Sequence, residues 1–168
     1  MSTLYLRFDK ESPETEALKS WWHWLDDNRG ERAILRRCGT LTDVVFAPAY
    51  HRLWSAVSRF GFVDDDGLAL VAGLAARIKE DIGSGSIAEQ MATAKSGGNA
   101  KARVSGLRFR RLLKVKERAD LFSTITRVIA LLGGSVNMQS LAQGVYFWND
   151  KTRKQWAYDY YSKAQSEA

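Results

Sequence analysis

Apolar residues recur along most of the chain at intervals of three and four, the spacing that places them on one face of an α-helix. Pro13, which follows Ser12, and Pro48 mark two helix starts, because proline suits the first helical turn. Strand-like sequence is confined to residues 3–8 and 42–46. The pattern predicts an all-α fold of about eight helices. They are expected within residues 13–25, 32–37, 48–60, 68–78, 107–116, 118–132, 137–148 and 150–161.

A segment rich in glycine and serine divides this helical pattern. Residues 83–106 contain five Gly and four Ser together with basic residues, which favours a flexible basic loop. A short helix at 87–94 is compatible with that interpretation. The length suits a single domain of 168 residues. We expect two small helical lobes within it, one over about 12–82 and one over about 107–165, joined by the loop.

Positive charge is concentrated in one part of the chain. Residues 95–118 hold nine Lys or Arg and a single acid, Glu117, whereas the whole chain has 25 Lys and Arg against 19 Asp and Glu. In the expected 107–116 helix, Phe109, Leu112 and Leu113 turn inward, and basic residues spread over the remaining arc. Those basic residues are Arg108, Arg110, Arg111 and Lys114.

Such a concentration attracts polyanions, because each basic side chain that meets a phosphate releases a condensed counterion. An isolated pair of basic residues is more often a solvated helix face. Nine of them with one acid repel each other unless an anion is present. Phe109 is the only aromatic residue of the window and is expected in the core. The sequence therefore predicts nucleic-acid binding through phosphates rather than through stacked bases.

A free-standing helical regulator that binds DNA or RNA is the main alternative. A regulator needs a recognition helix whose exposed face suits base edges, preferably with Asn, Gln and Arg. The 107–116 helix offers only Arg and Lys on that face. A regulator would also prefer one duplex sequence, whereas a phosphate-binding scaffold would not.

No catalytic centre emerges from the sequence. Cys38 is the only cysteine, so neither a disulfide nor a cysteine-based zinc site can form within one chain. His23 and His51 have no partnered acid nearby in sequence. Residues 64–66 are three aspartates that could bind a divalent metal, but acids before an apolar helix more often stabilise its N-terminus. We therefore expect no enzyme activity, no cofactor and no metal site.

The sequence shows neither a recognisable targeting signal nor a membrane-spanning segment. The first residues lack the continuous apolar core of a signal peptide, and no apolar run approaches the length needed to cross a bilayer. The prediction is a soluble, cytoplasmic protein without a membrane partner.

Four segments resemble the CasB family, the small subunit of the type I-E CRISPR surveillance complex called Cascade. They are RAILRR (32–37), PAYHRLW (48–54), VSGLRFRRLLKVKERADLF (104–122) and VNMQSLAQGVYFWNDKTRKQWAYDYY (136–161). No single segment is highly specific, but together they keep the family's order and spacing over about residues 18–162.

The resemblance implies a helical, non-enzymatic scaffold for antiviral defence. Two copies of such a subunit lie along the complex and contact its backbone and large subunits. Their basic surfaces support the guide RNA–target DNA duplex and the displaced strand of the R-loop, while base pairing itself reads the sequence. The matching basic positions are Arg36, Arg37, Arg108, Lys114, Lys151 and Arg153, with Arg118 close to them. The concentrated charge of the 107–116 helix adds Arg111.

Some of these positions also have structural interpretations. Arg118 falls on the apolar line of its helix, so an ion pair with Asp120 or a neighbouring helix is as reasonable as a phosphate contact. Arg36 and Arg37 end a short helix and could stabilise its C-terminal dipole. Trp148 and Trp156 are expected in the core, whereas two tyrosines off the Trp156 line are interface candidates. Those tyrosines are Tyr158 and Tyr161.

Overall fold

The computed structural model describes residues 5–94 and 101–166, with side chains up to residue 164. Ten α-helices, one 3-10 helix and two short strands occur in these residues, which confirms the predicted all-α class. The elements are α1 (Pro13–Trp24), α2 (Arg29–Arg37), α3 (Leu41–Phe46), α4 (Pro48–Val57), η1 (Ser58–Phe60), α5 (Asp65–Ala75), β1 (Glu80–Asp81), α6 (Ile87–Ala92), α7 (Gly106–Leu113), α8 (Arg118–Leu131), β2 (Ser135–Val136), α9 (Met138–Tyr146) and α10 (Asp150–Ser166).

Side-chain caps begin several helices where the sequence suggested. The Ser12 hydroxyl accepts a hydrogen bond from the Thr15 amide ahead of Pro13, and the Asp64 carboxylate accepts one from the Gly67 amide. The three aspartates at 64–66 thus cap and begin α5, as their position before an apolar helix indicated.

The strand candidates have a different outcome. Residues 42–46 lie in α3, because the Thr40 side chain caps that helix at the Asp43 amide and its Val44 side chain is buried in the core. Residues 3–8 contribute only an isolated bridge between Tyr5 and Phe62 within the described part. The strands that do form, β1 and β2, pair in parallel over two residues each.

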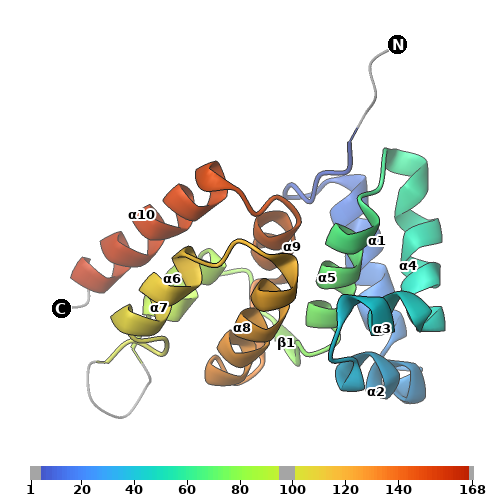
Figure 1. Cartoon of the computed structure of the whole chain (residues 1–168), viewed down its shortest axis with the longest axis horizontal. Coiled ribbons are helices and arrows are strands. Elements are labelled where there is room, and N and C mark those ends of the chain that lie inside the picture. Colours follow the sequence, from blue (N-terminus) through green and yellow to red (C-terminus); the bar gives the residue numbers. More distant parts are fainter. Residues whose placement is uncertain (1–4, 95–100, 167–168) are drawn as a thin grey trace.

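Helix α5 is the central element of the fold (Figure 1). Nine of its eleven residues are buried, and it packs against α3 and α4 on one side and α8 and α9 on the other. Gly73 permits this packing, since a Cβ there would lie 2.9 Å from the Phe122 ring. Helices α1 to α5 occupy one end of the view and α6 to α10 the other. The lobe boundaries near residues 82 and 107 stay a prediction.

The glycine- and serine-rich segment is packed where the structure describes it. Helix α6 carries a reciprocal cap between Ser86 and Glu89 and lies against α10. On the other side of the segment, Val104 is fully buried, and its carbonyl accepts a hydrogen bond from the Tyr160 hydroxyl at 2.6 Å. The short helix considered at 87–94 is therefore confirmed, while residues 95–100 of the expected flexible loop lie outside the described residues.

Candidate nucleic-acid interface

Helix α7 is fixed by its apolar face. The Ser105 side chain caps it at the Arg108 amide, and Phe109 is fully buried and stacked on Tyr160 with ring centroids 4.0 Å apart. Leu112 is also fully buried, whereas Leu113 is only partly buried against the core. The inward direction predicted for the apolar residues is confirmed, so the basic residues of this helix point away from the core.

Helix α10 and the residues before it hold the C-terminal end of α7. The Arg153 guanidinium donates to the Leu113 carbonyl at 3.1 Å, and the Trp148 indole donates to the Val115 carbonyl at 2.7 Å. Arg153 also pairs with Asp150. Arg153 is therefore close to the basic helix, but part of its hydrogen-bonding capacity maintains the helix rather than facing solvent.

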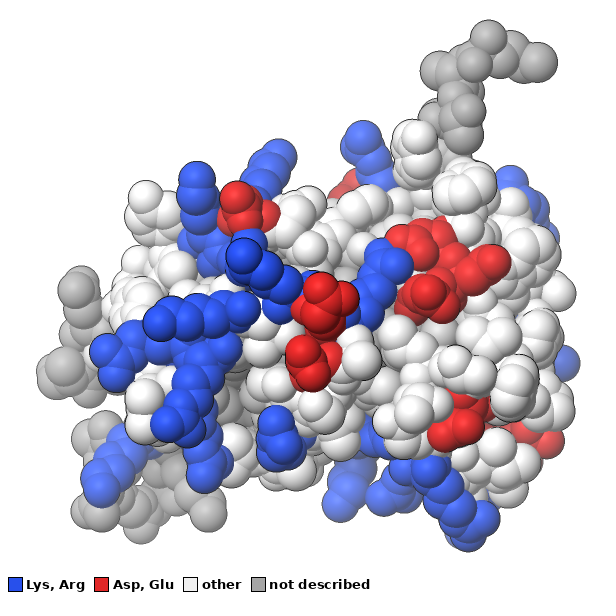
Figure 2. Space-filling view, viewed as in Figure 1, with Lys and Arg blue, Asp and Glu red and all other residues white. Residues whose placement is uncertain are grey.

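The outer face of α7 carries positive charge without compensation. No acidic residue occurs between positions 101 and 116. Arg108, Arg110, Arg111 and Lys114 are exposed, and none of them forms an ion pair among the described residues. Figure 2 shows Lys and Arg side chains gathered over the end of the molecule that contains α6 and α7. This surface has the charge expected of a phosphate-binding face.

A groove of about 320 Å³ runs between α7 and α8 beside these residues. Arg108 and Arg111 line it from α7, and Arg127 lines it from α8 above an apolar floor that includes Val115 and Val128. Arg127 is exposed and was not among the predicted residues. The sequence does place Arg127 on the polar face of the helix expected within residues 118–132. It does not show that this face lies beside the 107–116 helix.

Arg118 joins two helices instead of extending the basic face. Its guanidinium makes two hydrogen bonds to the carboxylate of Asp64, one of them at 3.0 Å, rather than pairing with Asp120. The Asp64 amide in turn donates to the Tyr146 hydroxyl at 2.8 Å, and burial raises the pKa of that phenol. Phosphate binding by Arg118 stays a prediction. To contact a phosphate, its guanidinium would have to give up the ion pair with Asp64.

Arg36 and Arg37 lie in the last turn of α2, separated from α7 in Figure 1. Arg77 holds this turn: its guanidinium donates to the carbonyls of Arg36 and Cys38 at 3.0 and 2.9 Å and to that of Gly73 at 2.6 Å. Burial lowers the pKa of Arg77. The side chains of Arg36 and Arg37 are exposed, so they form a second basic site apart from the α7 face.

Lys151 is exposed on the first turn of α10 and lines a different groove, between α9 and α10. The structure thus brings together Arg108, Arg111 and Lys114 of the predicted set and places Arg153 at the end of their helix. Lys151 lies apart from them, in the groove between α9 and α10.

Groups that could support other chemistry are few in the described residues. No cluster of three or more His, Cys, Asp or Glu that could hold a metal ion occurs there. Burial, followed by the charge of Asp43, raises the pKa of the Cys38 thiol, which disfavours the reactive thiolate. Nor does this part of the chain include a helix both long and apolar enough to cross a membrane.

Residues 31–161 match the family described as CRISPR-associated protein Cse2. The chain belongs to the Cse2 family. The resemblance to CasB seen in the sequence is therefore confirmed. No curated protein matches the chain.

Two solved structures share the fold of this Cse2-family chain. One is a chain in the crystal structure of E. coli Cascade bound to a PAM-containing dsDNA target, with a TM-score of 0.72 and 19% identity over 90% of this chain and 96% of that one. The other is CasB from Thermus thermophilus, with a TM-score of 0.63 and 23% identity over 90% and 99% of the two chains.

Proposed function

We propose that this chain is a non-enzymatic small subunit of a type I-E Cascade complex and that α7 carries its principal nucleic-acid contact. In this proposal it stabilises the guide RNA–target DNA duplex and the displaced strand, beside a second copy of itself and the backbone and large subunits. The family and the similarity to a chain of a DNA-bound Cascade support the assignment to the complex.

The observation that carries the nucleic-acid role is the uncompensated outer face of α7. Arg108, Arg111 and Lys114 stand on a helix whose inner face is fixed by Phe109, so the backbone positions from which their side chains reach out are set before any ligand binds. A guanidinium group can bind phosphate oxygens with two hydrogen bonds. Together with Arg127 they line or flank one groove, which suits a backbone that follows the surface.

This face recognises backbones rather than base sequence. Its exposed side chains in α7 are Arg and Lys with the apolar Leu107, and they include no aromatic ring on which a base could stack. Sequence discrimination in such a complex comes from guide–target pairing. The alternative of a sequence-specific regulator has no structural observation in its favour.

A fluorescence-anisotropy titration tests the proposal. Single-stranded DNA, duplex DNA and RNA of several unrelated sequences are titrated at three salt concentrations. The wild type should bind all sequences alike with a steep salt dependence. The triple variant Arg108→Ala, Arg111→Ala, Lys114→Ala should lower the salt slope by roughly 2, which at 0.1 M salt corresponds to about a hundredfold weaker binding to single strands.

A matched triple variant in the first sixty residues provides the control. Lys10→Ala, Arg29→Ala and Arg59→Ala remove the same charge from exposed positions outside α7. This control should keep a slope close to that of the wild type. If both triple variants lost the same affinity and salt slope, the loss would follow from net charge and not from the α7 face. Tight binding to one duplex sequence would favour a regulator.

A further inference from the structure

A stripe of exposed residues runs along the outer side of α10. Its members lie three or four positions apart, so they share one face of the helix. They are Lys151, Lys154, Tyr158 and Tyr161. Tyr158 is 72% exposed and Tyr161 40%, while the opposite side of the helix packs against α6. The stripe therefore combines open aromatic surface with positive charge.

The two tyrosines border a hollow of about 610 Å³ on this stripe. Lys154 lines the hollow as well, together with the small side chains of Ala157 and Ser162. A space between aromatic rings and a cation suits a flat aromatic group that carries negative charge next to it. A nucleotide has both parts, because its base presents a π-face and its phosphate an anion.

Tyr161 lies against the same buried rings that fix α7. Its ring meets Phe109 and Tyr160 edge to face, with centroids 5.7 and 5.3 Å apart. Both of these neighbours are buried. The orientation of the Tyr161 ring is therefore set by packing, and the stripe of α10 lies beside the helix that carries the basic face.

Arg110 is the basic residue of α7 on the side of α10. Arg108 and Arg111 line the groove toward α8, and Arg110 does not. Arg110 instead precedes Leu113 by one turn, and the Leu113 carbonyl accepts a hydrogen bond from Arg153 of α10. The Arg110 side chain is exposed and has no ion pair in the part of the chain that the structure describes. Positive charge thus continues from α7 toward the tyrosines.

The carboxylates of α10 are engaged away from the hollow. Asp150 pairs with Arg153, and Asp159 accepts hydrogen bonds from the Ser86 hydroxyl at 3.0 Å and from the Gln155 amide at 2.9 Å. The residues that line the hollow include no acid. An anion in the hollow would therefore meet a cation without a competing carboxylate.

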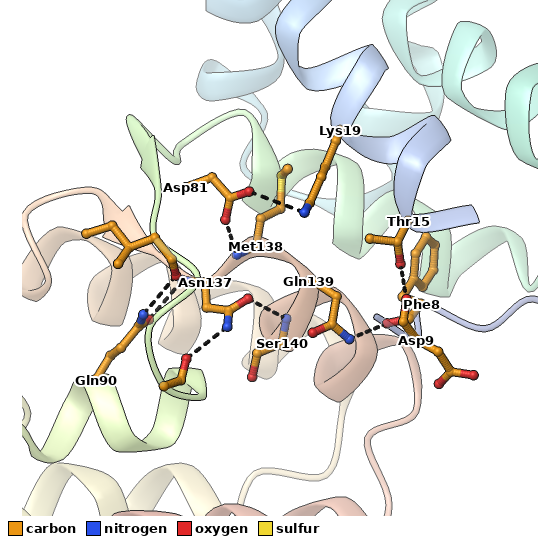
Figure 3. A network of polar contacts seen from close by, with 12 residues as sticks. Phe8, Asp9, Thr15, Lys19, Asp81, Gln90, Asn137, Met138, Gln139 and Ser140 are labelled. Atoms are coloured by element: carbon orange, nitrogen blue, oxygen red, sulfur yellow. Dashed lines mark hydrogen bonds and ion pairs between the residues drawn. The ribbon is translucent and has the colours of Figure 1, made fainter. Parts of the chain in front are cut away.

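Helix α6, which receives the Asp159 contact through Ser86, is itself held in place. Figure 3 shows Asn137 with polar contacts to Gln90 of α6 and Ser140 of α9. The Asn137 side chain also donates to the Gly85 carbonyl at 2.8 Å. The inner side of α10 therefore rests on an anchored helix, and its outer stripe has a fixed direction.

The acids near Tyr158 determine from which side a strand can approach. Glu89 and Asp159 line a second hollow with Tyr158, on the side of α6. A backbone on that side would bring its phosphates toward two carboxylates, whereas a backbone on the side of α7 meets Arg110. The favourable path thus continues the basic face of α7.

The residue types of the stripe favour nucleic acid over a protein partner. Tyrosine is common at protein–protein interfaces, but lysine is depleted there. Basic groups interleaved with exposed rings are instead typical of surfaces that bind single strands. A duplex fits less well, because its bases are already paired and stacked.

We infer that Tyr158 and Tyr161 stack unpaired bases of a single strand whose phosphates are bound by Arg110 and Lys154. The α7 face holds the backbone by charge, and the tyrosines add a contact that only unpaired bases can make. This inference rests on the proposed nucleic-acid function and specifies the form of nucleic acid that α10 selects. It assigns no base preference, because every base has a π-face.

An abasic strand tests the inference, because it keeps the phosphates and lacks the bases. Fluorescence anisotropy of the full chain compares oligothymidine, an abasic oligonucleotide of the same length, and a duplex. The wild type should bind oligothymidine at least about fivefold more tightly than the abasic strand, the effect of stacking one base.

Substitutions at Tyr158 and Lys154 separate stacking from charge. Tyr158→Ala should weaken oligothymidine about fivefold or more and leave the abasic strand and the duplex within about twofold, with an unchanged salt slope. Tyr158→Phe keeps the ring and should bind as the wild type does. Lys154→Ala should weaken both single strands alike and lower their salt slopes by roughly 0.7.

Phe46→Ala is the matched control. It removes another largely exposed ring, at the end of α3, and should leave the affinity for oligothymidine within about twofold. Tyr158 contacts no other ring among the described residues, so Tyr158→Ala is expected to fold.

Three results would overturn the stacking site. They are equal affinity of the wild type for oligothymidine and the abasic strand, equal losses of both strands in Tyr158→Ala, and no loss of either. A change of oligomeric state in Tyr158→Ala, measured by sedimentation velocity, would assign the stripe to a second copy of the chain.

The same titration judges the proposed function separately. A wild-type protein that binds neither strand would contradict the nucleic-acid function of α7. A protein that binds both strands alike would keep that function and lose only the stacking site.

Discussion

The outer face of α7 and the junction between α5 and α8 both depend on arginine, with opposite results. On α7, Arg108, Arg110 and Arg111 face solvent without an acid. At the junction, Arg118 is bound through both terminal nitrogens to Asp64, whose carboxylate also caps α5. Arg108 and Arg118 are only ten positions apart in the sequence. Charge density along the chain thus locates a candidate functional surface, but the partner of each side chain decides whether it belongs to that surface.

Two more arginines follow the pattern of the junction. Arg77 donates to three backbone carbonyls at the ends of α5 and α2, and Arg153 donates to the last turn of α7. Their guanidinium groups satisfy carbonyls that a helix leaves without partners at its C-terminus. The fold therefore uses one set of arginines to position the surface that another set forms.

The sharpest test of this division is Arg77→Ala. Loss of three hydrogen bonds from a charged donor, with carbonyls left unsatisfied, should lower the free energy of unfolding by about 3 kcal/mol. Arg77→Lys should recover little, since one ammonium group cannot span the three carbonyls. Urea denaturation monitored by tryptophan fluorescence measures both. Arg29→Ala, at an exposed position of α2, is the control, and a cost for Arg77→Ala no greater than that of the control would contradict the structural role.

A smaller effect is expected at the junction. A double-mutant cycle with Arg118→Ala and Asp64→Asn should give a coupling energy of about 1 kcal/mol, because the pair makes two hydrogen bonds but is partly exposed. Asparagine retains an oxygen that can cap α5, so the cycle isolates the ion pair from the cap.

Nucleic-acid binding gives the same junction variant a second measurement. Arg118→Ala should change the affinity for single-stranded DNA less than about threefold, the size of a small electrostatic change. An affinity loss as large as that of the α7 triple variant would place Arg118 on the binding surface. The α5–α8 junction would then no longer differ in function from the outer face of α7.

The smallest change in the free energy of unfolding is expected for a substitution on α7 itself. Arg110→Gln removes a charge that has no acid nearby and lies one turn from Lys114. The free energy of unfolding should therefore stay within about 0.5 kcal/mol of the wild type, with any gain greatest at low salt, where repulsion between like charges is strongest. Denaturation at low and high salt measures this. A clear loss of stability would mean that Arg110 has a structural partner.

Much of the fold could be predicted because helix signals are local. The Ser12–Pro13 start, the aspartate cap of α5 and the inward direction of Phe109 all follow from neighbouring residues. The α3 segment was ambiguous, because Val44 and Val45 suit strands as well as buried helix faces. The two-residue pairing of β1 with β2 joins residues 55 apart and has no local pattern.

The part of the candidate site that lies on a single helix could be predicted from the sequence. Arg108, Arg111 and Lys114 share a face by helical periodicity alone. The position of Arg127 across the groove, the ion pair of Arg118 with Asp64 and the separate groove of Lys151 depend on how helices pack. The exposed Tyr158 and Tyr161 beside the buried Tyr160 were also predictable, since the three alternate around a single helix.

The burial of α5 on nearly every side determines when this chain can fold during synthesis. Its apolar residues 68–75 need α8 and α9 as partners, and α9 ends at Tyr146, some seventy residues later. A ribosome-bound chain that has emerged only as far as α6 therefore exposes its most apolar helix. Stable packing of the first helices must wait until almost the whole chain has been made, and in that interval the nascent protein is most exposed to aggregation.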